Sequence, residues 1–259
     1  MPRIAANLAY LFTERPLIER FGAAAAAGFK AVELRFPYDD HPPPPVKAEL
    51  ERHGLTMLGL NTAPGRQFGT AAVPGCEKEF DAAFQQALDY AVAIGGRAVH
   101  CLSGAVPPAQ RAAAEATFVS NMMRAADLAL AKNIRLLVEP INQRERPDYF
   151  VSYVEYAADL IARIGRPNVK VQYDFYHVQI MQGDLIKRFE RNLPVIGHVQ
   201  IAAVPSRHEP DEGEVNYPAI FEALDGMGYD GFVACEYFPR GRTEDGLAWA
   251  RPCGVVPRG

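Results

Sequence analysis

Two short segments of the sequence, IRLLVE at residues 134–139 and VKVQYD at residues 169–174, are built alike. Each is rich in apolar residues and ends in a carboxylate, Glu139 in the first segment and Asp174 in the second. Runs of this length and character are typical of strands buried on both faces of a parallel sheet. A carboxylate at the end of such a strand is costly unless it meets a cation or a hydrogen-bond donor. The segments therefore predict a buried parallel sheet that carries chemistry at its carboxyl edge.

Six other segments share this strand character. The eight predicted strands span residues 3–8, 31–34, 55–60, 97–102, 134–139, 169–174, 197–202 and 232–236. Helical patterns separate them, and the clearest spans 152–164, where Ser152 and Glu155 form a capping box and Gly165 is the stop signal. Apolar periodicity also predicts helices at 17–24, 80–91, 118–130 and 217–227.

Alternation of eight strands with helices predicts the architecture. With 259 residues, each strand–helix unit has about 32 residues, the size expected for a (β/α)8 TIM barrel. A doubly wound sheet is the rival, but it would use fewer strands and often a glycine-rich phosphate loop after the first strand. Here the first strand leads into Asn7-Leu8-Ala9-Tyr10, without that motif. We therefore expect an α/β protein, a single barrel domain over residues 1–259.

Composition and charge exclude several classes of protein. Apolar residues make up 49% of the chain and charged residues 22%, which argues against a disordered chain. The net charge of −4 offers no basic face to nucleic acid. No stretch approaches the roughly 20 apolar residues that span a bilayer, and no signal sequence begins the chain. Four widely spaced cysteines are typical of reduced thiols in a cytoplasmic protein.

The last four predicted strands carry oxygen ligands at or near their ends. These residues are Glu139, Asp174, Gln200 and Glu236. In a closed parallel barrel the strand ends share one rim, which is where barrel active sites lie. Three carboxylates there would repel one another without a divalent cation, and an all-oxygen set suits Mg²⁺ or Mn²⁺ better than Zn²⁺. A single acid at a strand end is more often a surface or capping residue, so the prediction of one metal ion depends on all four.

Several motifs around these residues resemble one family. They are Glu139-Pro-Ile-Asn142, Tyr173-Asp-Phe-Tyr-His177, His198-Val-Gln-Ile201, Arg207-His-Glu-Pro-Asp211 and Cys235-Glu-Tyr237. In combination they are similar to the hydroxypyruvate isomerase family of xylose-isomerase-like barrels. The resemblance implies a metal-dependent isomerase that interconverts hydroxypyruvate and 2-hydroxy-3-oxopropanoate (tartronate semialdehyde). It also implies that the four strand-end residues are the metal ligands.

The same resemblance implies further roles. Glu145 and His177 match positions that contact substrate in related ketose epimerases; a capping or packing role is the alternative for His177. Those epimerases carry histidine where Gln200 stands, which favours the isomerase branch. The 2-oxo-tetronate isomerases share nearly all the motifs and remain open as the first alternative, and ketose 3-epimerisation is the second.

Elementary chemistry agrees with an isomerase. Moving a carbonyl to the adjacent carbon requires removal of a C–H proton next to a ketone, and the intermediate is an enediolate. A divalent cation stabilises its negative charge, and a nearby carboxylate can take the proton and return it to the next carbon. Glu139 and Glu236 are the catalytic candidates, either as base with the other as acid. No redox cofactor is required, because no net electron transfer occurs.

Four other polar residues lie near the predicted rim, and each has two possible roles or an expected structural one. Arg207 and His208 follow the seventh strand, where a forked guanidinium suits a substrate carboxylate; a solvated loop arginine is the alternative. His100 lies near the end of the fourth strand, where it either touches substrate or packs. His198 is expected to point out of the barrel and to be structural. The expected partner is a small sugar acid, and a homo-oligomer is compatible with the sequence.

Two other classes of function fit the sequence less well than an isomerase does. Metal-dependent endonucleases that act on abasic DNA share the barrel, but they need more histidine and acid ligands and a cationic face than six histidines and a net charge of −4 provide. A catalytically silent binding barrel would be favoured by an apolar residue at one of the four ligand positions, and none is apolar.

Overall fold

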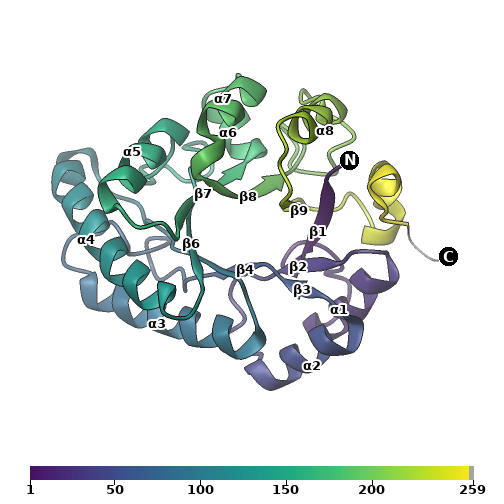
Figure 1. Cartoon of the computed structure of the whole chain (residues 1–259), viewed down its shortest axis with the longest axis horizontal. Helices are drawn as coiled ribbons and strands as arrows, with labels where there is room; N and C mark the ends of the chain where they lie inside the picture. Colours follow the sequence, from purple (N-terminus) through teal and green to yellow (C-terminus); the bar gives the residue numbers. More distant parts are fainter. Residues whose placement is uncertain (257–259) are drawn as a thin grey trace.

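A parallel sheet that closes on itself forms the centre of the computed structural model, which describes residues 1–256 (Figure 1). The strand segments follow the order β3-β2-β1-β9-β8-β7-β6-β5-β4, and all the pairings are parallel. Their bounds are β1 (Arg3–Asn7), β2 (Ala31–Glu33), β3 (Thr56–Met57), β4 (Gly59–Asn61), β5 (Ala98–His100), β6 (Arg135–Val138), β7 (Val169–Asp174), β8 (Ile196–Ile201) and β9 (Phe232–Cys235). All eight predicted strands are confirmed.

The nine segments make eight barrel strands because the predicted strand at 55–60 is interrupted at Leu58. Its first part, β3, pairs with β2, and its second part, β4, pairs with β5. Backbone hydrogen bonds from Leu58 to Val32 (2.9 Å) and from Leu34 to Gly59 (3.0 Å) continue the ladder across the interruption. The strand therefore joins its two neighbours and closes the barrel, as the family resemblance implied.

Helices cover the outside of the barrel, as Figure 1 shows. They are α1 (Leu17–Ala26), α2 (Pro43–His53), α3 (Glu77–Ile94), α4 (Arg111–Leu130), α5 (Val154–Ile164), α6 (Phe175–Met181), α7 (Leu185–Asn192) and α8 (Tyr217–Gly226), with short 3₁₀ helices η1 (Pro108–Gln110), η2 (Leu193–Val195) and η3 (Thr243–Cys253). Their apolar faces form the core between helices and sheet; on α5, for example, Leu160 and Ile164 are fully or almost fully buried. This burial against the strands stabilises the helices far more than intrinsic propensity does.

The predicted capping box of α5 is wrong. Ser152 donates its hydroxyl to the carbonyl of Tyr149 (3.1 Å), and Glu155 pairs with Gln182 and Arg188 instead of turning back on the helix. The side-chain carbonyl of Gln182 accepts from the backbone N–H of Val154 (2.9 Å) and takes over the cap. A residue distant in sequence thus performs the task that the local motif predicted for Ser152.

Alternation along the strands divides the barrel interior into layers. Side chains two residues apart on one strand point to the same side, so His198 and Gln200 on β8 both face the interior. The prediction that His198 points outward is therefore wrong: its Nε2 lies 2.7 Å from Glu33 Oε2 inside the barrel. Glu139 and Glu236 directly follow β6 and β9 and stand at the carboxyl rim, one layer above this interior.

Candidate metal and active site

Asp174 ends β7 and at the same time caps α6. Its Oδ1 accepts a hydrogen bond from the backbone N–H of Tyr176 (2.9 Å), which satisfies a free donor at the helix N-terminus. Oδ2 is buried without a hydrogen-bond partner and lies 3.6 Å from His177 Nε2. Because the carboxylate and the first turn of α6 are locked together, the second oxygen has a fixed direction.

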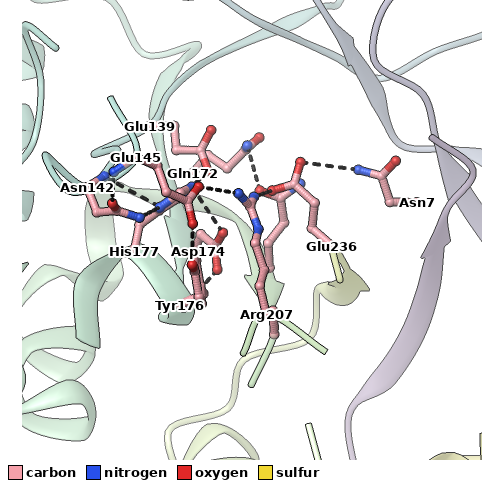
Figure 2. A network of polar contacts seen from close by, with 12 residues as sticks. Asn7, Glu139, Asn142, Glu145, Gln172, Asp174, Tyr176, His177, Arg207 and Glu236 are labelled. Carbon is pink, nitrogen blue, oxygen red and sulfur yellow. Dashed lines mark hydrogen bonds and ion pairs between the residues drawn. The ribbon is translucent and has the colours of Figure 1, made fainter. Parts of the chain in front are cut away.

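Four buried side chains converge at the rim. Glu139, Asp174, His177 and Glu236 each offer one ligand atom, and these atoms all lie within 4.8 Å of one another. Three of them are predicted ligands, and Figure 2 shows them facing a common centre. Glu139 Oε1 and Asp174 Oδ2 are buried oxygens without hydrogen-bond partners. Unsatisfied buried carboxylate oxygens converging in this way fit a divalent cation.

Proximity and burial make the three carboxylates reluctant to ionise. Burial and then the charge of Glu236 raise the pKa of Asp174 to about 8. Burial, Glu236 and Asp174 raise the pKa of Glu139 well above its ordinary value. Burial also raises the pKa of Glu236, although the charges of Arg207 and Arg35 oppose it. The cluster therefore retains protons unless a further positive charge is bound in it.

Arg207 supplies one positive charge from the loop after β8. Its Nη1 donates to Glu145 Oε2 (2.6 Å) and its Nη2 to Glu236 Oε2 (2.9 Å). Burial opposes its charge, but the carboxylates, Glu236 first, raise the pKa of Arg207 overall. Tyr176 donates its hydroxyl to the other oxygen of Glu145. Arg207 thus bridges a rim carboxylate and the residue predicted to contact substrate.

His177 has a defined tautomer because of Asn142. The amide oxygen of Asn142 accepts from the backbone N–H of Glu145 (2.8 Å), so its NH₂ group faces His177 Nδ1 at 2.7 Å and donates to it. Burial lowers the pKa of His177 well below its ordinary value, which makes the ring neutral. Its proton is therefore on Nε2, 3.7 Å from Glu139 and 3.6 Å from Asp174. In this tautomer His177 is a hydrogen-bond donor toward the site, and its Nε2 offers no lone pair to a metal ion.

Gln200 lies beside Asp174 in the sheet register but makes its contacts in the layer below the rim. Its Nε2 donates to Glu33 Oε1 (2.6 Å), and its Oε1 accepts from Gln172 Nε2 (2.7 Å). Glu33 also accepts a hydrogen bond from Asn7 (2.8 Å). Because this buried carboxylate accepts from the NH₂ group of Gln200, the amide oxygen of Gln200 points away from Glu33. The role of Gln200 as a metal ligand stays a prediction.

A cavity of about 490 Å³ opens above the cluster. It is lined by the predicted residues Glu139, Glu145, His177, Arg207 and Glu236, and by residues that the sequence analysis did not single out, among them Tyr10, Arg35, Arg144, Arg146 and Tyr176. Asn142 and Glu33 were also missed. The signal for Arg35 was its spacing: it follows Glu33 by two residues, which puts both on the same side of one chain segment.

Two predicted substrate contacts lie elsewhere. His208 has its Nδ1 2.7 Å from the carbonyl oxygen of Phe238 and is not among the residues that line the cavity. His100 is buried beneath it, with Nδ1 3.4 Å from Glu139 Oε2. Burial lowers the pKa of His100 to about 3, so the ring is neutral. In this structure His100 packs against a rim carboxylate and does not line the cavity.

Comparison with known proteins adds independent findings. The model of the xylose isomerase-like TIM barrel family matches residues 21–253. A 2-oxo-tetronate isomerase of Cupriavidus necator is 45% identical over 97% of this chain and 98% of its own length. A hydroxypyruvate isomerase of Escherichia coli is 38% identical over 97% of this chain and 99% of its own. A crystal structure from Brucella melitensis, described as AP endonuclease, family 2, has a TM-score of 0.95 at 48% identity and covers 97% of this chain and 99% of that one.

Fold, carboxylate cluster and relatives together define the class of protein, an isomerase built on a parallel barrel. The chain belongs to the xylose isomerase-like TIM barrel family, alongside the hydroxypyruvate and 2-oxo-tetronate isomerases. The family resemblance found in the sequence is thereby confirmed. Among residues 1–256, no helix is long and apolar enough to cross a membrane.

The raised pKa of Asp174 predicts a pH-dependent stability without metal. The folded protein keeps this proton up to about pH 8, whereas the unfolded chain loses it near pH 4. The folded state binds more protons in this interval, so the free energy of unfolding falls as pH rises through it. For EDTA-treated protein we expect a loss of about 1 kcal/mol between pH 7 and pH 8, measured by urea unfolding. The Asp174→Asn variant should lose less of its unfolding free energy over the same pH interval.

Saturating Mn²⁺ should reverse this trend, because the ligands bind metal in their ionised form. The stabilisation by Mn²⁺ should therefore be larger at pH 8 than at pH 7. An equal gain at both pH values, or none, would contradict a carboxylate metal site.

Proposed function

We propose that this isomerase moves a carbonyl between adjacent carbons of a short 2-oxo acid, interconverting hydroxypyruvate and tartronate semialdehyde. The observation that carries this proposal is the convergence of three buried carboxylates below an arginine-lined cavity. The names of the Escherichia coli and Cupriavidus necator relatives support the same chemistry. Because both substrates are small anions, a cavity with several arginines suits them better than neutral sugars.

One divalent ion, Mg²⁺ or Mn²⁺, completes the proposed site, with Glu139, Asp174, Gln200 and Glu236 as ligands. When bound, the ion supplies charge stabilisation to the oxygens of the enediolate. The fit rests on the unsatisfied oxygens of Glu139 and Asp174 and on the donor tautomer of His177, which leaves an oxygen-rich ligand set.

The chain itself moves the proton. One of Glu139 and Glu236 takes a proton from C3 of hydroxypyruvate, and the other delivers a proton to C2. The hydroxyl proton on the C3 oxygen passes to the C2 oxygen, so that the ketone at C2 becomes a hydroxyl and the alcohol at C3 an aldehyde. Proton exchange with water then returns the two glutamates to their starting states. The high pKa values of both residues suit them to hold a proton between the two events. No electrons leave the substrate.

Residues of the cavity wall orient the substrate in this proposal. His177 donates from Nε2 to a substrate oxygen, since Asn142 occupies its other nitrogen. Glu145 accepts from a substrate hydroxyl while Arg207 holds it in place. Arg207 also limits the negative charge on Glu236 before the proton is taken.

The second candidate is 2-oxo-tetronate, which has one more carbon. It is favoured by the size of the cavity, about 490 Å³, which leaves room beyond a three-carbon acid, and by the 45% identity to the relative of that name. Both candidates share the carboxylate, the 2-oxo group and the neighbouring hydroxyl. We also propose a cytoplasmic setting, supported by four cysteines that are all free thiols.

Removal of the proton acceptors tests the mechanism. Glu139→Gln and Glu236→Gln keep the shape and one oxygen ligand but cannot take a proton. We expect each to lower kcat by about 100-fold or more, assayed with saturating Mn²⁺ because metal affinity will also fall. Asp174→Asn is the matched control, since it changes the cluster charge equally without removing a proposed base. A variant with near-normal kcat would exclude its glutamate from proton transfer.

Exchange of one ligand tests Gln200. Gln200→His replaces an oxygen ligand by an imidazole nitrogen. The metal that activates the enzyme best should therefore change from Mg²⁺ toward Co²⁺ or Zn²⁺. The measurement is the order of activation of EDTA-treated protein by these three metals and Mn²⁺. His198→Gln, on the same strand and also bonded to Glu33, is the control that should keep the order. If Gln200→His also keeps it, Gln200 does not touch the ion.

A substrate panel tests the proposed function as a whole. With Mn²⁺ present, hydroxypyruvate and 2-oxo-tetronate should turn over at least 10-fold faster, as kcat/KM, than D-tagatose or D-fructose. The physical reason is that a charged hydrogen bond to the carboxylate contributes about 1.5–3 kcal/mol. Faster epimerisation of either ketose would replace the isomerase proposal by a ketose 3-epimerase.

A further inference from the structure

The arginines of the cavity differ in their pairing. Arg207 is bound by two carboxylates. Arg35, Arg144 and Arg146 line the same cavity and form no ion pair within residues 1–256. Arg144 and Arg146 are exposed, so water screens their charge, whereas Arg35 is half-buried. Among the unpaired arginines of the cavity, Arg35 is therefore the one whose charge is least screened by water for an incoming anion.

The chain places Arg35 directly above the interior network. It follows β2 and lies two residues beyond Glu33, so it points toward the barrel mouth one layer above that carboxylate. Its Nη1 donates to the hydroxyl of Tyr10 (2.8 Å), and its Nε is buried without a hydrogen-bond partner in the described chain. Part of its donor fork is thus unused in a place that water does not reach freely.

Aromatic rings hold Arg35 in position. Its guanidinium carbon lies 5.3 Å from the ring centroid of Tyr10, 4.9 Å from that of Phe36 and 5.8 Å from that of Phe68. Ring faces attract a cation but accept no strong hydrogen bond from its N–H edges. The rings therefore fix the charge and leave its donors for a ligand.

The same rings connect Arg35 to the rest of the site. Arg207 lies 5.5 Å from the Tyr10 centroid, so Tyr10 stands between the paired and the unpaired arginine. Arg146 lies 4.0 Å from the Phe68 centroid and adds a second unpaired cation on that side. Arg35 and Arg207, which binds Glu236, thus share contact with one aromatic ring, that of Tyr10.

We propose that Arg35, with Arg146 as an auxiliary cation, binds the carboxylate of the 2-oxo acid. This assignment rests on the proposed function and deepens it by naming the residue that selects an acid. Arg207 is the alternative anchor and its Nε is likewise without a partner, but both of its terminal nitrogens already donate to carboxylates, Glu145 and Glu236. Arg35 gives up only a hydrogen bond to Tyr10, and its planar fork matches a carboxylate.

The two anchors predict different kinetics. The substrate carboxylate keeps its charge throughout the isomerisation, so an anchor that binds only this group stabilises ground state and transition state equally. Loss of such an anchor raises KM and leaves kcat nearly unchanged. Arg35 acts on Glu236 only through its charge, whereas Arg207 also donates a hydrogen bond to it. Loss of Arg207 should therefore lower kcat as well as raise KM.

Kinetics of Arg35→Met and Arg35→Gln with saturating Mn²⁺ test the proposal. We expect KM for hydroxypyruvate to rise about 10- to 100-fold, with kcat within about 3-fold of wild type. Arg66→Met is the matched control: Arg66 is exposed, does not line the cavity and forms no ion pair in the described chain. Its KM should stay within 2-fold of wild type. A far-UV circular dichroism spectrum and a urea midpoint like those of wild type show that each variant is folded.

Binding of inert ligands separates this proposal from the proposed function. D-glycerate and its neutral amide differ only in the carboxylate, and calorimetry measures both without turnover. Arg35→Met should weaken binding of the acid about 10-fold or more and binding of the amide less than 3-fold. Equal loss for both ligands, or a wild-type KM in both Arg35 variants, would overturn the assignment. Wild-type protein that binds D-glycerate through Arg35 but turns over neither 2-oxo acid would refute the proposed function alone.

Discussion

Mutual repulsion of three buried carboxylates is the constraint on which the site depends. Glu139, Asp174 and Glu236 come from three different strands, and the barrel brings their oxygens within a few ångströms of one another. Burial and proximity both raise their pKa values, so the arrangement is stable only with retained protons or with bound positive charge. Arg207 supplies part of that charge, and a divalent ion fits the remainder. The proposed affinity for metal thus follows from how the strands end.

The barrel turns a spacing of two residues into a difference in depth. Glu33 and Arg35 lie on one chain segment, yet the first is buried in the interior network and the second lines the cavity. His198 and Gln200 are also two residues apart, on β8, and both contact Glu33 in this interior network. A polar layer thus supports the rim from below and orients its side chains.

The fold and the rim acids could be predicted from sequence because both follow from local patterns. Each strand is a short apolar run, and Glu139 and Asp174 follow such runs directly. Features that depend on distant partners could not be predicted: Gln182 replaces Ser152 as the cap of α5, and Arg35 owes its position to Tyr10 and Phe68. The outward orientation assigned to His198 failed for another reason, because strand alternation already placed it beside Gln200.

Two sequence motifs act as one hydrogen-bonded unit. In the loop after β6, the backbone N–H of Glu145 fixes the amide of Asn142, and that amide fixes the tautomer of His177 on α6. His177 Nε2 then lies 3.7 Å from Glu139, which begins the same loop, and 3.6 Å from Asp174. The spacing of three residues from Glu139 to Asn142 and three more to Glu145 therefore has a physical meaning. Each of these residues determines the protonation or the orientation of the next, so the motif carries its chemistry only when all of it is present.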